Sequence, residues 1–366
     1  MIAIILTCTT IAYAIELLLL RYGLEKADHI PTNNDTEPMV SVIVAARNEE
    51  DRILECVDSL SKIEYPHEKL EIIIINDGST DKTAEILASF VSTHSNMKFI
   101  TASPGENVGL LGKTNAVAQG IESSRGDILM FTDADCRVPE SWVRETVKCF
   151  TDDVGIVGGF TVLDASRPFE GIQMLDWIFL FGLSSATAGW NLPLTVIGNN
   201  LSVRRSAYNA TGGYRAIPFS VTEDYALVQA ILNVTDYRVA FPVNPASVVK
   251  SKACQNWHQL FRQKQRWGVG GLDMVLRGMM VMLMAWIARC VLLIAAFQVN
   301  LSTIILAIIL ICYVDLRFLW KPLRRFSRLG SLKYFIAFEL YLTLYMLILP
   351  AIAFLSKDVV WKERRL

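Results

Sequence analysis

Long apolar runs near both ends of the sequence constrain the fold more than any other feature. Residues 1–20 contain one charged residue, Glu16, residues 278–314 contain only Arg289, and residues 334–356 are similarly poor in charge. A helix of about 20 apolar residues spans the hydrocarbon core of a bilayer, which is ~30 Å thick. The composition, 52% hydrophobic and 19% charged, is too apolar for an ordinary soluble domain and too charged for a pure membrane bundle. We therefore expect a soluble domain between one N-terminal and about three C-terminal transmembrane helices.

The N-terminal run is expected to be an uncleaved membrane anchor over residues 1–23. A cleaved signal peptide is the alternative, but it would need basic residues before the apolar run and a small-residue cleavage site after it. Neither is present in the sequence. Arg21 and Lys26 follow the run, so the positive-inside rule places this end of the helix in the cytoplasm. Residues 24–39 read as a polar linker.

The C-terminal segment, residues 278–356, is expected to hold about three further spans. The first apolar run is long for a single span, so we predict a hairpin that turns near Gln298–Asn300; one span at 290–314 is the alternative. The hairpin keeps the basic loop 321–333 inside with the soluble domain and leaves only the short tail 357–366 against the positive-inside rule. The prediction is a multi-pass cell-membrane protein with a cytoplasmic soluble domain and both termini outside.

Residues 40–250 predict an α/β domain. Short apolar, β-branched runs that are typical of buried parallel strands alternate with helical segments. The predicted strands are 40–45, 71–75, 98–101 and 128–132, and the predicted helices are 49–61, 81–92 and 113–123. This alternation favours a doubly wound sheet that binds ligands at the carboxyl ends of its strands. Residues 251–277 are basic, aromatic and polar, which is typical of helices at a membrane interface.

Charge and cysteine content exclude some classes of function. The net charge of −1 gives no sign of a nucleic-acid partner, and none is expected. The seven cysteines form no CxxC pair, and the four histidines do not cluster with them. A zinc site or a disulfide framework is therefore not expected.

Two polar motifs follow predicted strands. In Asn76-Asp77-Gly78-Ser79, glycine permits a tight turn and the Asp77 carboxylate can accept hydrogen bonds from a nucleobase; a turn that caps the next helix is the alternative. In Thr132-Asp133-Ala134-Asp135, two carboxylates at i and i+2 can share a divalent cation and a diphosphate. Oxygen ligands of this kind suit Mg²⁺ or Mn²⁺. The alternative for this second motif is an ordinary loop.

Two further motifs lie nearer the C-terminus. Thr222-Glu223-Asp224-Tyr225 can supply a general base, or it can simply begin a helix, with Thr222 as the cap and acids in the first turn. In the segment from Gln263 to Trp267, Arg266 can neutralise a diphosphate and Trp267 suits a membrane interface. The alternative is an interface helix with no role in binding.

Taken in order, these motifs resemble those of the family 2 glycosyltransferases. The match begins at Val42-Ile43-Val44-Ala45-Ala46-Arg47-Asn48-Glu49-Glu50 and continues through the NDGS, DAD, TED and QxxRW motifs, over about residues 38–270. It implies an α/β, Rossmann-like nucleotide-diphospho-sugar transferase domain with the GT-A fold. The membrane-flanked layout is similar to that of the ceramide glucosyltransferase and polysaccharide synthase branches.

The resemblance implies an inverting hexosyltransferase that uses Mg²⁺ or Mn²⁺ and a nucleotide-diphosphate sugar, with UDP favoured over GDP. Asp224 would be the catalytic base and Asp135 the metal ligand. Donor contacts would come from Ala46, Glu49, Asp77, Lys113, Asp133, Asp135, Gln263 and Arg266, and acceptor contacts from Glu223 and Trp267. The sequence departs from many relatives at Asn76, where they carry an acid, which leaves the details of base recognition open.

The acceptor is expected to be a membrane lipid, which would make the product a glycolipid. The alternatives are a processive polysaccharide synthase and, from another class, an inactive membrane scaffold or receptor, which the intact carboxylates argue against. A polymer channel needs a polar lining, and the predicted spans carry few polar groups: Glu16, Arg289, Gln298, Asn300, Asp315 and Glu339. A mid-span cation such as Arg289 should face the bundle interior. It can pair there with Asp315 or Glu339, or contact a lipid.

Overall fold

The chain folds into two compact units, each of which is built from separate stretches of the sequence. The computed structural model describes residues 1–28, 36–104, 110–271, 276–355, 360–361 and 364–365. Parts of the predicted linker (29–35) and of the predicted interfacial segment (272–275), and most of the tail, lie outside these residues. The helical unit comprises Met1–Ala27, Asp164–Leu194 and Ala253–Lys357. The α/β unit comprises Asp28–Leu163, Thr195–Lys252 and Asp358–Leu366.

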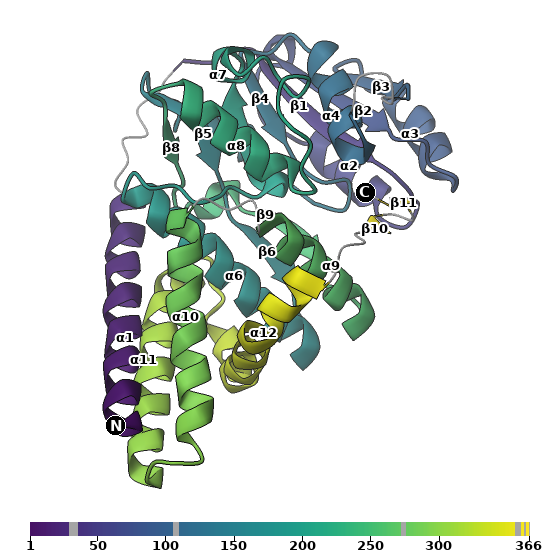
Figure 1. Cartoon of the computed structure of the whole chain (residues 1–366). Coiled ribbons are helices and arrows are strands. Elements are labelled where there is room, and N and C mark those ends of the chain that lie inside the picture. The colour runs from purple at the N-terminus through teal and green to yellow at the C-terminus, as the bar shows by residue number, and fades with distance from the viewer. Residues whose placement is uncertain (29–35, 105–109, 272–275, 356–359, 362–363, 366) are drawn as a thin grey trace. The chain divides into compact units, whose positions relative to one another are not determined.

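The α/β unit is built on a seven-stranded sheet with the strand order β3-β2-β1-β4-β7-β5-β8 (Figure 1). The strands are β1 (Val40–Ala46), β2 (Leu70–Asn76), β3 (Met97–Thr101), β4 (Ile128–Phe131), β5 (Val154–Gly158), β7 (Leu201–Arg204) and β8 (Arg238–Ala240). β1 pairs in parallel with β2 and with β4, and β2 pairs in parallel with β3. The four predicted strands are confirmed. β7, which was not predicted, runs antiparallel to β4 and β5.

Helices follow the first strands as the alternating pattern predicted. The helices of this unit are α2 (Ile53–Ser61), α3 (Thr83–Val91), α4 (Gly112–Glu122), α5 (Trp142–Val147), α7 (Arg205–Ala210) and α8 (Glu223–Val234). Short 3-10 turns lie at His67–Lys69, Gly198–Asn200 and Pro245–Ser247, and two small sheets pair β6 (Thr161–Asp164) with β9 (Val249–Lys252) and β10 (Val360–Trp361) with β11 (Arg364–Arg365). Every residue of β2 is buried, as expected for a strand covered on both faces.

The helical unit contains the predicted apolar spans. Its helices are α1 (Ile2–Ala27), α6 (Pro168–Gly189), α9 (Trp257–Gly270), α10 (Leu276–Ala295), α11 (Leu301–Arg325) and α12 (Phe335–Leu355), with a 3-10 turn at Leu329–Tyr334. Within the described residues, four helical segments are long and apolar enough to cross a membrane: Ile2–Ala27, Gly278–Ala295, Leu301–Arg325 and Leu329–Ile352. The predicted hairpin is confirmed, because α10 and α11 are separate helices that lie side by side with α1 (Figure 1).

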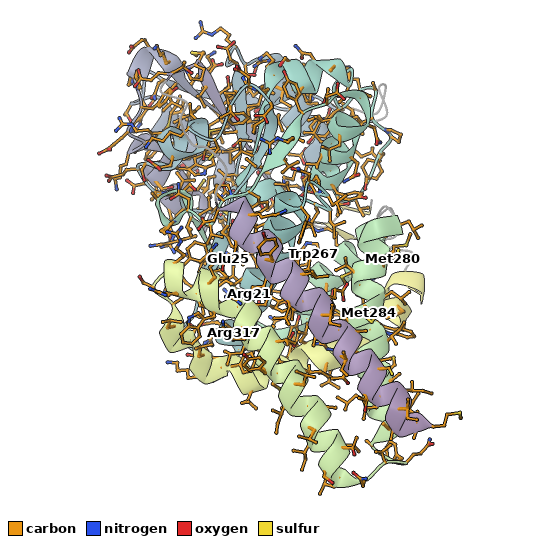
Figure 2. The ribbon with its side chains drawn as sticks, turned by 90° about the vertical axis from the view of Figure 1, so that its left-hand side faces the viewer. Arg21, Glu25, Trp267, Met280, Met284 and Arg317 are labelled. Atoms are coloured by element: carbon orange, nitrogen blue, oxygen red, sulfur yellow. The ribbon has the colours of Figure 1, made fainter. Side chains whose placement is uncertain are left out.

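The C-terminal ends of α1 and α11 lie at the same end of the helical unit. Lys321 of α11 donates to the carboxylate of Glu25 at 2.7 Å and to the carbonyl oxygen of Leu24 at 3.2 Å. One turn earlier in α1, Arg21 lies 3.8 Å from the other carboxylate oxygen of Glu25 (Figure 2). The residues that follow α11 are therefore close to the end of α1.

α6 is not among the elements predicted from the sequence. It crosses α1 with the two backbones almost in contact: a Cβ atom on Gly23 would lie 2.3 Å from the carbonyl oxygen of Ala186, and one on Gly189 would lie 1.9 Å from that of Gly23. Beside this crossing, the indole N–H of Trp190 donates to the carbonyl oxygen of Leu19 at 2.9 Å. Small residues allow helices to approach closely where apolar packing alone gives little specificity.

A buried polar cluster joins α1, α10 and α11. The Arg289 guanidinium lies 3.1 Å from the Asp315 carboxylate and donates to the Tyr13 hydroxyl at 3.4 Å. Tyr13 in turn donates to the other oxygen of Asp315 at 2.5 Å. Arg289 and Asp315 are 1% and 0% exposed. The ion-pair alternative for Arg289 is therefore the one found, with Asp315 as its partner.

We expect Arg289→Ala to destabilise the protein strongly, because it leaves the Asp315 carboxylate buried without its counter-charge. Losing one partner of a buried ion pair costs about 3–5 kcal/mol. The double variant Arg289→Met/Asp315→Leu should recover most of this loss, since apolar groups then replace both charges. Denaturant unfolding of detergent-solubilised protein measures the effect, with Arg324→Ala, at an exposed position of α11, as control. Equal stability of Arg289→Ala and the control would contradict a structural role for the pair.

Candidate active site

The loops that follow β1 and β2 form one continuous surface at the carboxyl edge of the sheet. Ala46 pairs with Asn76 in the β1–β2 register, and the Asp77 N–H donates to the carbonyl oxygen of Ala46 at 2.8 Å. The Arg47 guanidinium donates to the carbonyl oxygens of Asp77 and Gly78 at 2.6 and 2.8 Å. This edge therefore brings together two of the residues predicted to contact the donor, Ala46 and Asp77.

The NDGS segment is a turn of its own and does not cap α3. Gly78 adopts a positive φ of 61°, the conformation that the tight turn was expected to need. α3 begins at Thr83, five residues further on, and its N-cap is Lys82. Glu49, another predicted donor residue, donates its backbone N–H to the Thr83 hydroxyl at 2.8 Å. Glu49 therefore lies on the loop beside the start of α3.

Lys113 connects two of the predicted acidic motifs. Its ammonium lies 2.7 Å from an oxygen of Asp133 and 2.8 Å from an oxygen of Glu223. Burial acts to lower the pKa of Lys113, but the charges of Asp133 and Glu223 outweigh burial and raise the pKa well above its usual range. The group therefore stays positively charged, and it holds the end of β4 against the start of α8.

Asp224 lies in the first turn of α8, next to Glu223. The Gly198 N–H donates to one of its carboxylate oxygens at 2.6 Å, and its neighbour Tyr225 donates a backbone N–H to the other at 2.8 Å. Burial, and then the nearby charge of Glu223, raise the pKa of Asp224 to about 6. A carboxylate with such a pKa is largely ionised at neutral pH yet basic enough to accept a proton, which suits a general base.

The helix-start alternative for the TED motif agrees with the structure, with Thr222 at the N-cap position, and the general-base role of Asp224 stays a prediction. α8 begins at Glu223 after Thr222, but the Thr222 side chain makes no capping hydrogen bond. Its hydroxyl lies 3.2 Å from that of Ser220. A small cavity lies beside Asp224, and its lining includes Lys113, Thr132, Gly198, Tyr214, Glu223 and Asp224.

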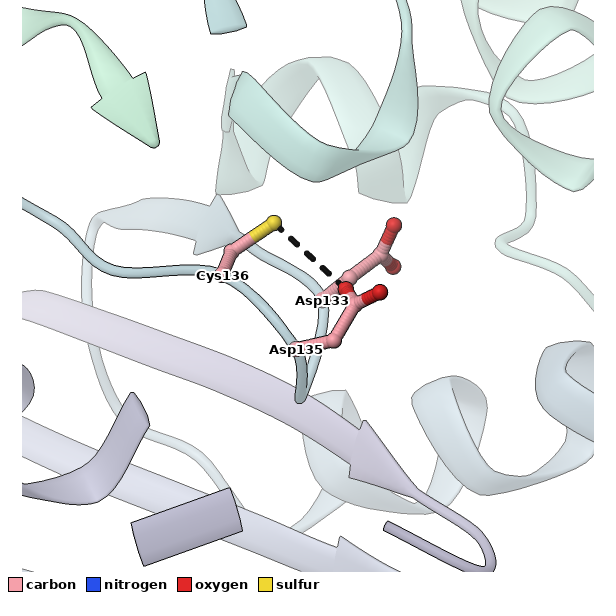
Figure 3. Close-up of side chains that lie close together, drawn as sticks. All are labelled: Asp133, Asp135 and Cys136. Carbon is pink, nitrogen blue, oxygen red and sulfur yellow. Dashed lines mark hydrogen bonds between the residues drawn. The ribbon is translucent and has the colours of Figure 1, made fainter. Parts of the chain in front are cut away.

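Asp133 and Asp135 can hold a divalent cation. Their carboxylates and the Cys136 thiol offer ligand atoms that lie within 4.8 Å of one another (Figure 3). The two acids occupy a turn beyond the end of β4 rather than the strand itself. Burial, reinforced by the charges of Asp135 and Asp133, raises the pKa of the Cys136 thiol well above its usual range. The Cys136 thiol donates to Asp135 at 3.7 Å. A hard cation such as Mg²⁺ or Mn²⁺ prefers oxygen to sulfur, so it would take the carboxylate oxygens.

Three residues that contact Asp135 or Asp224 were not predicted from the sequence: Arg52, Gly198 and Cys136. Arg52, just before α2, lies 3.2 Å from the Asp135 carboxylate. Gly198 belongs to a segment for which no role was predicted, and no role was predicted for Cys136 either. Only the position of Cys136, directly after the DAD motif, could have pointed to it. The contacts of Arg52 and Gly198 depend on the fold of residues far apart in the sequence.

The QxxRW residues Gln263, Arg266 and Trp267 lie on α9 in the helical unit (Figure 2 labels Trp267). The Trp267 ring lies 5.6 Å from that of Trp177 on α6. Lys264, within the same motif, is buried; its ammonium lies 2.5 Å from the Asp176 carboxylate and 4.5 Å from the centre of the Trp267 ring. This ion pair fixes the turn of α9 that carries Trp267, and neither Lys264 nor Asp176 was predicted to matter. The donor and acceptor roles of the QxxRW residues stay predictions.

Residues 41–225 match the sequence profile of Glycosyl transferase family 2, over half of the chain. This chain therefore belongs to glycosyltransferase family 2. The family predicted from the order of the motifs is confirmed.

Relatives of several kinds are similar to this chain. A probable glycosyltransferase, YdaM, of Bacillus subtilis is 29% identical over 66% of this chain and 57% of its own length. The beta-monoglucosyldiacylglycerol synthase of Synechocystis is 28% identical over 64% of this chain and 48% of its own. The poly-beta-1,6-N-acetyl-D-glucosamine synthase of Staphylococcus aureus is 28% identical over 70% and 60%. The chain thus spans about half to three-fifths of the length of these relatives.

A solved structure shares the fold. The mannosyltransferase PcManGT of Pyrobaculum calidifontis, solved in complex with GDP-Man and Mn²⁺, is 20% identical to this chain. The match has a TM-score of 0.61 and covers 93% of this chain and 99% of that one. The predicted fold class is therefore confirmed: a GT-A domain with one N-terminal and three C-terminal helices that are long and apolar enough to span a membrane.

Proposed function

We propose that this protein transfers a single sugar from a nucleotide-diphosphate sugar, with UDP as the favoured carrier, to a membrane lipid. The observation that carries the proposal is the position of Lys113, which bonds to both Asp133 and Glu223 and so brings the candidate donor site beside the candidate base, Asp224. The relatives named as a glucolipid synthase and a polysaccharide synthase support transfer to a large acceptor.

The proposed reaction is a single in-line displacement with inversion. The acceptor oxygen forms a bond to the anomeric carbon while the bond to the nucleoside diphosphate breaks, and no covalent enzyme intermediate forms. Asp224 takes the proton of the acceptor hydroxyl, and the N–H groups of Gly198 and Tyr225 hold its carboxylate in place. Mg²⁺ or Mn²⁺ bound to the carboxylates of Asp133 and Asp135 would supply positive charge to the leaving diphosphate.

The remaining predicted residues have proposed roles in binding. Asp77 would accept a hydrogen bond from the nucleobase, and Ala46 and Glu49 would border the nucleotide. Gln263 and Arg266 of the QxxRW motif would contact the diphosphate. Acceptor contacts would come from Glu223 and Trp267.

A lipid acceptor is favoured over a growing polysaccharide. Within the described spans, three polar groups that could line a channel, Tyr13, Arg289 and Asp315, are buried and bonded to one another. They therefore join helices instead of offering hydrogen bonds to a hydrated polymer, which a channel would need. A processive polysaccharide synthase is the second candidate, favoured by the relative of that name.

The proposal predicts transfer of label from a nucleotide sugar into lipid. Membranes that contain the protein should be incubated with a panel of labelled UDP- and GDP-sugars and then extracted with organic solvent. Label is expected in a single glycolipid band, and membranes with Asp224→Asn serve as the control. Label in high-molecular-weight material that a glycosidase degrades would contradict the lipid acceptor and support the polysaccharide synthase.

Asp224→Asn should lower transfer by roughly 10²–10⁴, the usual contribution of a general base, and leave donor affinity within a few-fold of wild type. The wild-type kcat/KM should rise with pH up to about 6, where Asp224 loses its proton, and the variant should lack this limb. Isothermal titration with donor and a pH profile measure both effects. Asp236→Asn, at an exposed acid beyond α8, is the control. If donor binding and transfer fell together, Asp224 would be a binding or structural residue.

We also propose that the four apolar helices cross the cell membrane with the catalytic domain in the cytoplasm. The bond between Lys321 and Glu25 supports this topology, because it puts the basic loop 321–333 at the same end of the helical unit as the basic end of α1.

This topology predicts that a cysteine in the basic loop is protected in intact cells. Ser327→Cys in a Cys8→Ser background should react with a membrane-impermeant maleimide only after permeabilisation. The Cys8→Ser change removes an exposed native thiol, and the background without Ser327→Cys is the control. Labelling at position 327 from outside intact cells would contradict the orientation.

A further inference from the structure

Both carboxylate oxygens of Asp135 have partners within the protein. The Cys136 thiol donates to one oxygen at 3.7 Å, and the Arg52 guanidinium lies 3.2 Å from the other. The side chains of Arg52 and Asp135 are 26% and 27% exposed. A cation of the protein itself thus occupies an oxygen that the proposed metal ion would use.

The position of Arg52 is set by α2, which it directly precedes. α2 is bonded to the segment that carries the two acids: the Cys56 thiol donates to the carbonyl oxygen of Asp133 at 3.7 Å, and the Ser59 hydroxyl accepts the Val138 N–H at 3.1 Å. These contacts fix the start of α2 beside Asp135. The bond between Arg52 and Asp135 is therefore part of the packing of this helix, unlike a chance pairing of two surface side chains.

We propose that Arg52 is a positioning residue that competes with the divalent cation for Asp135 and so sets the metal affinity of the site. The inference rests on the proposed role of Asp135 as a metal ligand. An arginine cannot lose its proton in a protein, so its charge leaves the carboxylate only when the side chain moves. Without the cation, Arg52 holds Asp135 in place and offsets its charge.

Competition of this kind couples metal binding to donor binding. A divalent cation must displace the guanidinium from its oxygen or bind against its repulsion, and both lower the affinity of the empty site. The negatively charged diphosphate of the donor can pair with the Arg52 guanidinium in place of Asp135. The cation should therefore bind Asp135 more tightly when the donor is present. By linkage, the donor should bind more tightly by the same factor when the cation is present.

The test measures Mn²⁺ binding to the full-length protein in detergent, without donor and without turnover, from the paramagnetic resonance signal of free Mn²⁺. Arg52→Gln and Arg52→Met should bind Mn²⁺ roughly three- to tenfold more tightly than wild type, the scale of a partly exposed ion pair. Arg52→Lys keeps the positive charge and should bind it about as weakly as wild type. In both neutral variants, added UDP should tighten Mn²⁺ binding by a smaller factor than in wild type.

Two controls separate the possible failures. Arg137→Gln removes an arginine that pairs with a different acid, Glu55 of α2, at 3.6 Å, and it should leave Mn²⁺ affinity unchanged. Asp135→Asn should abolish binding. If it does so while both neutral Arg52 variants bind Mn²⁺ no more tightly than wild type, the competition is overturned and the metal site stands. If Asp135→Asn binds Mn²⁺ as wild type does, the proposed metal ligand is wrong and the role of Arg52 falls with it.

Discussion

The parallel pairing of β1 with both β2 and β4 is the constraint on which the α/β unit depends. It delivers the ends of three strands to one edge of the sheet, so that residues from 46 to 135 in the sequence reach a common surface. The ammonium of Lys113 then brings α8 to the same place by bonding to Glu223 as well as Asp133. Strand pairing therefore sets the positions of Asp77, Asp133 and Asp135 at this edge, and the bonds of Lys113 bring Glu223 beside Asp133.

The two units differ in how deeply their ion pairs are buried. In the helical unit, Arg289 and Asp315 are almost completely buried, so each charge needs the opposite charge of the other to offset its loss of hydration. Their ion pair holds α10 and α11 together in a fixed arrangement. In the α/β unit, Lys113, Arg52 and their carboxylate partners stay partly exposed. Water and a bound ligand can compete for these groups at moderate cost. A buried pair suits a fixed scaffold, whereas a partly exposed pair suits a site that must exchange one counter-ion for another.

The sequence predicted the parts of this protein that local patterns determine. Apolar runs located the spans and the break between α10 and α11, β-branched runs located β1 to β4, and motif order identified the family. It could not predict α6, whose place depends on a close approach to α1, nor the reversed strand β7. It also missed Arg52, because its partner lies 83 residues away and no local pattern links the two.

The crossing of α1 and α6 at Gly23 and Gly189 has a practical consequence. From its sequence, α1 could be a simple membrane anchor that another hydrophobic segment could replace. Its backbone, however, packs closely against α6, which lies within the residues that match the glycosyltransferase family. A truncated form without residues 1–27 would expose the matching face of α6 to water, including the Trp190 indole that loses its acceptor. Purification of this protein is therefore better attempted in detergent or nanodiscs with the first helix retained than in water with the first helix removed.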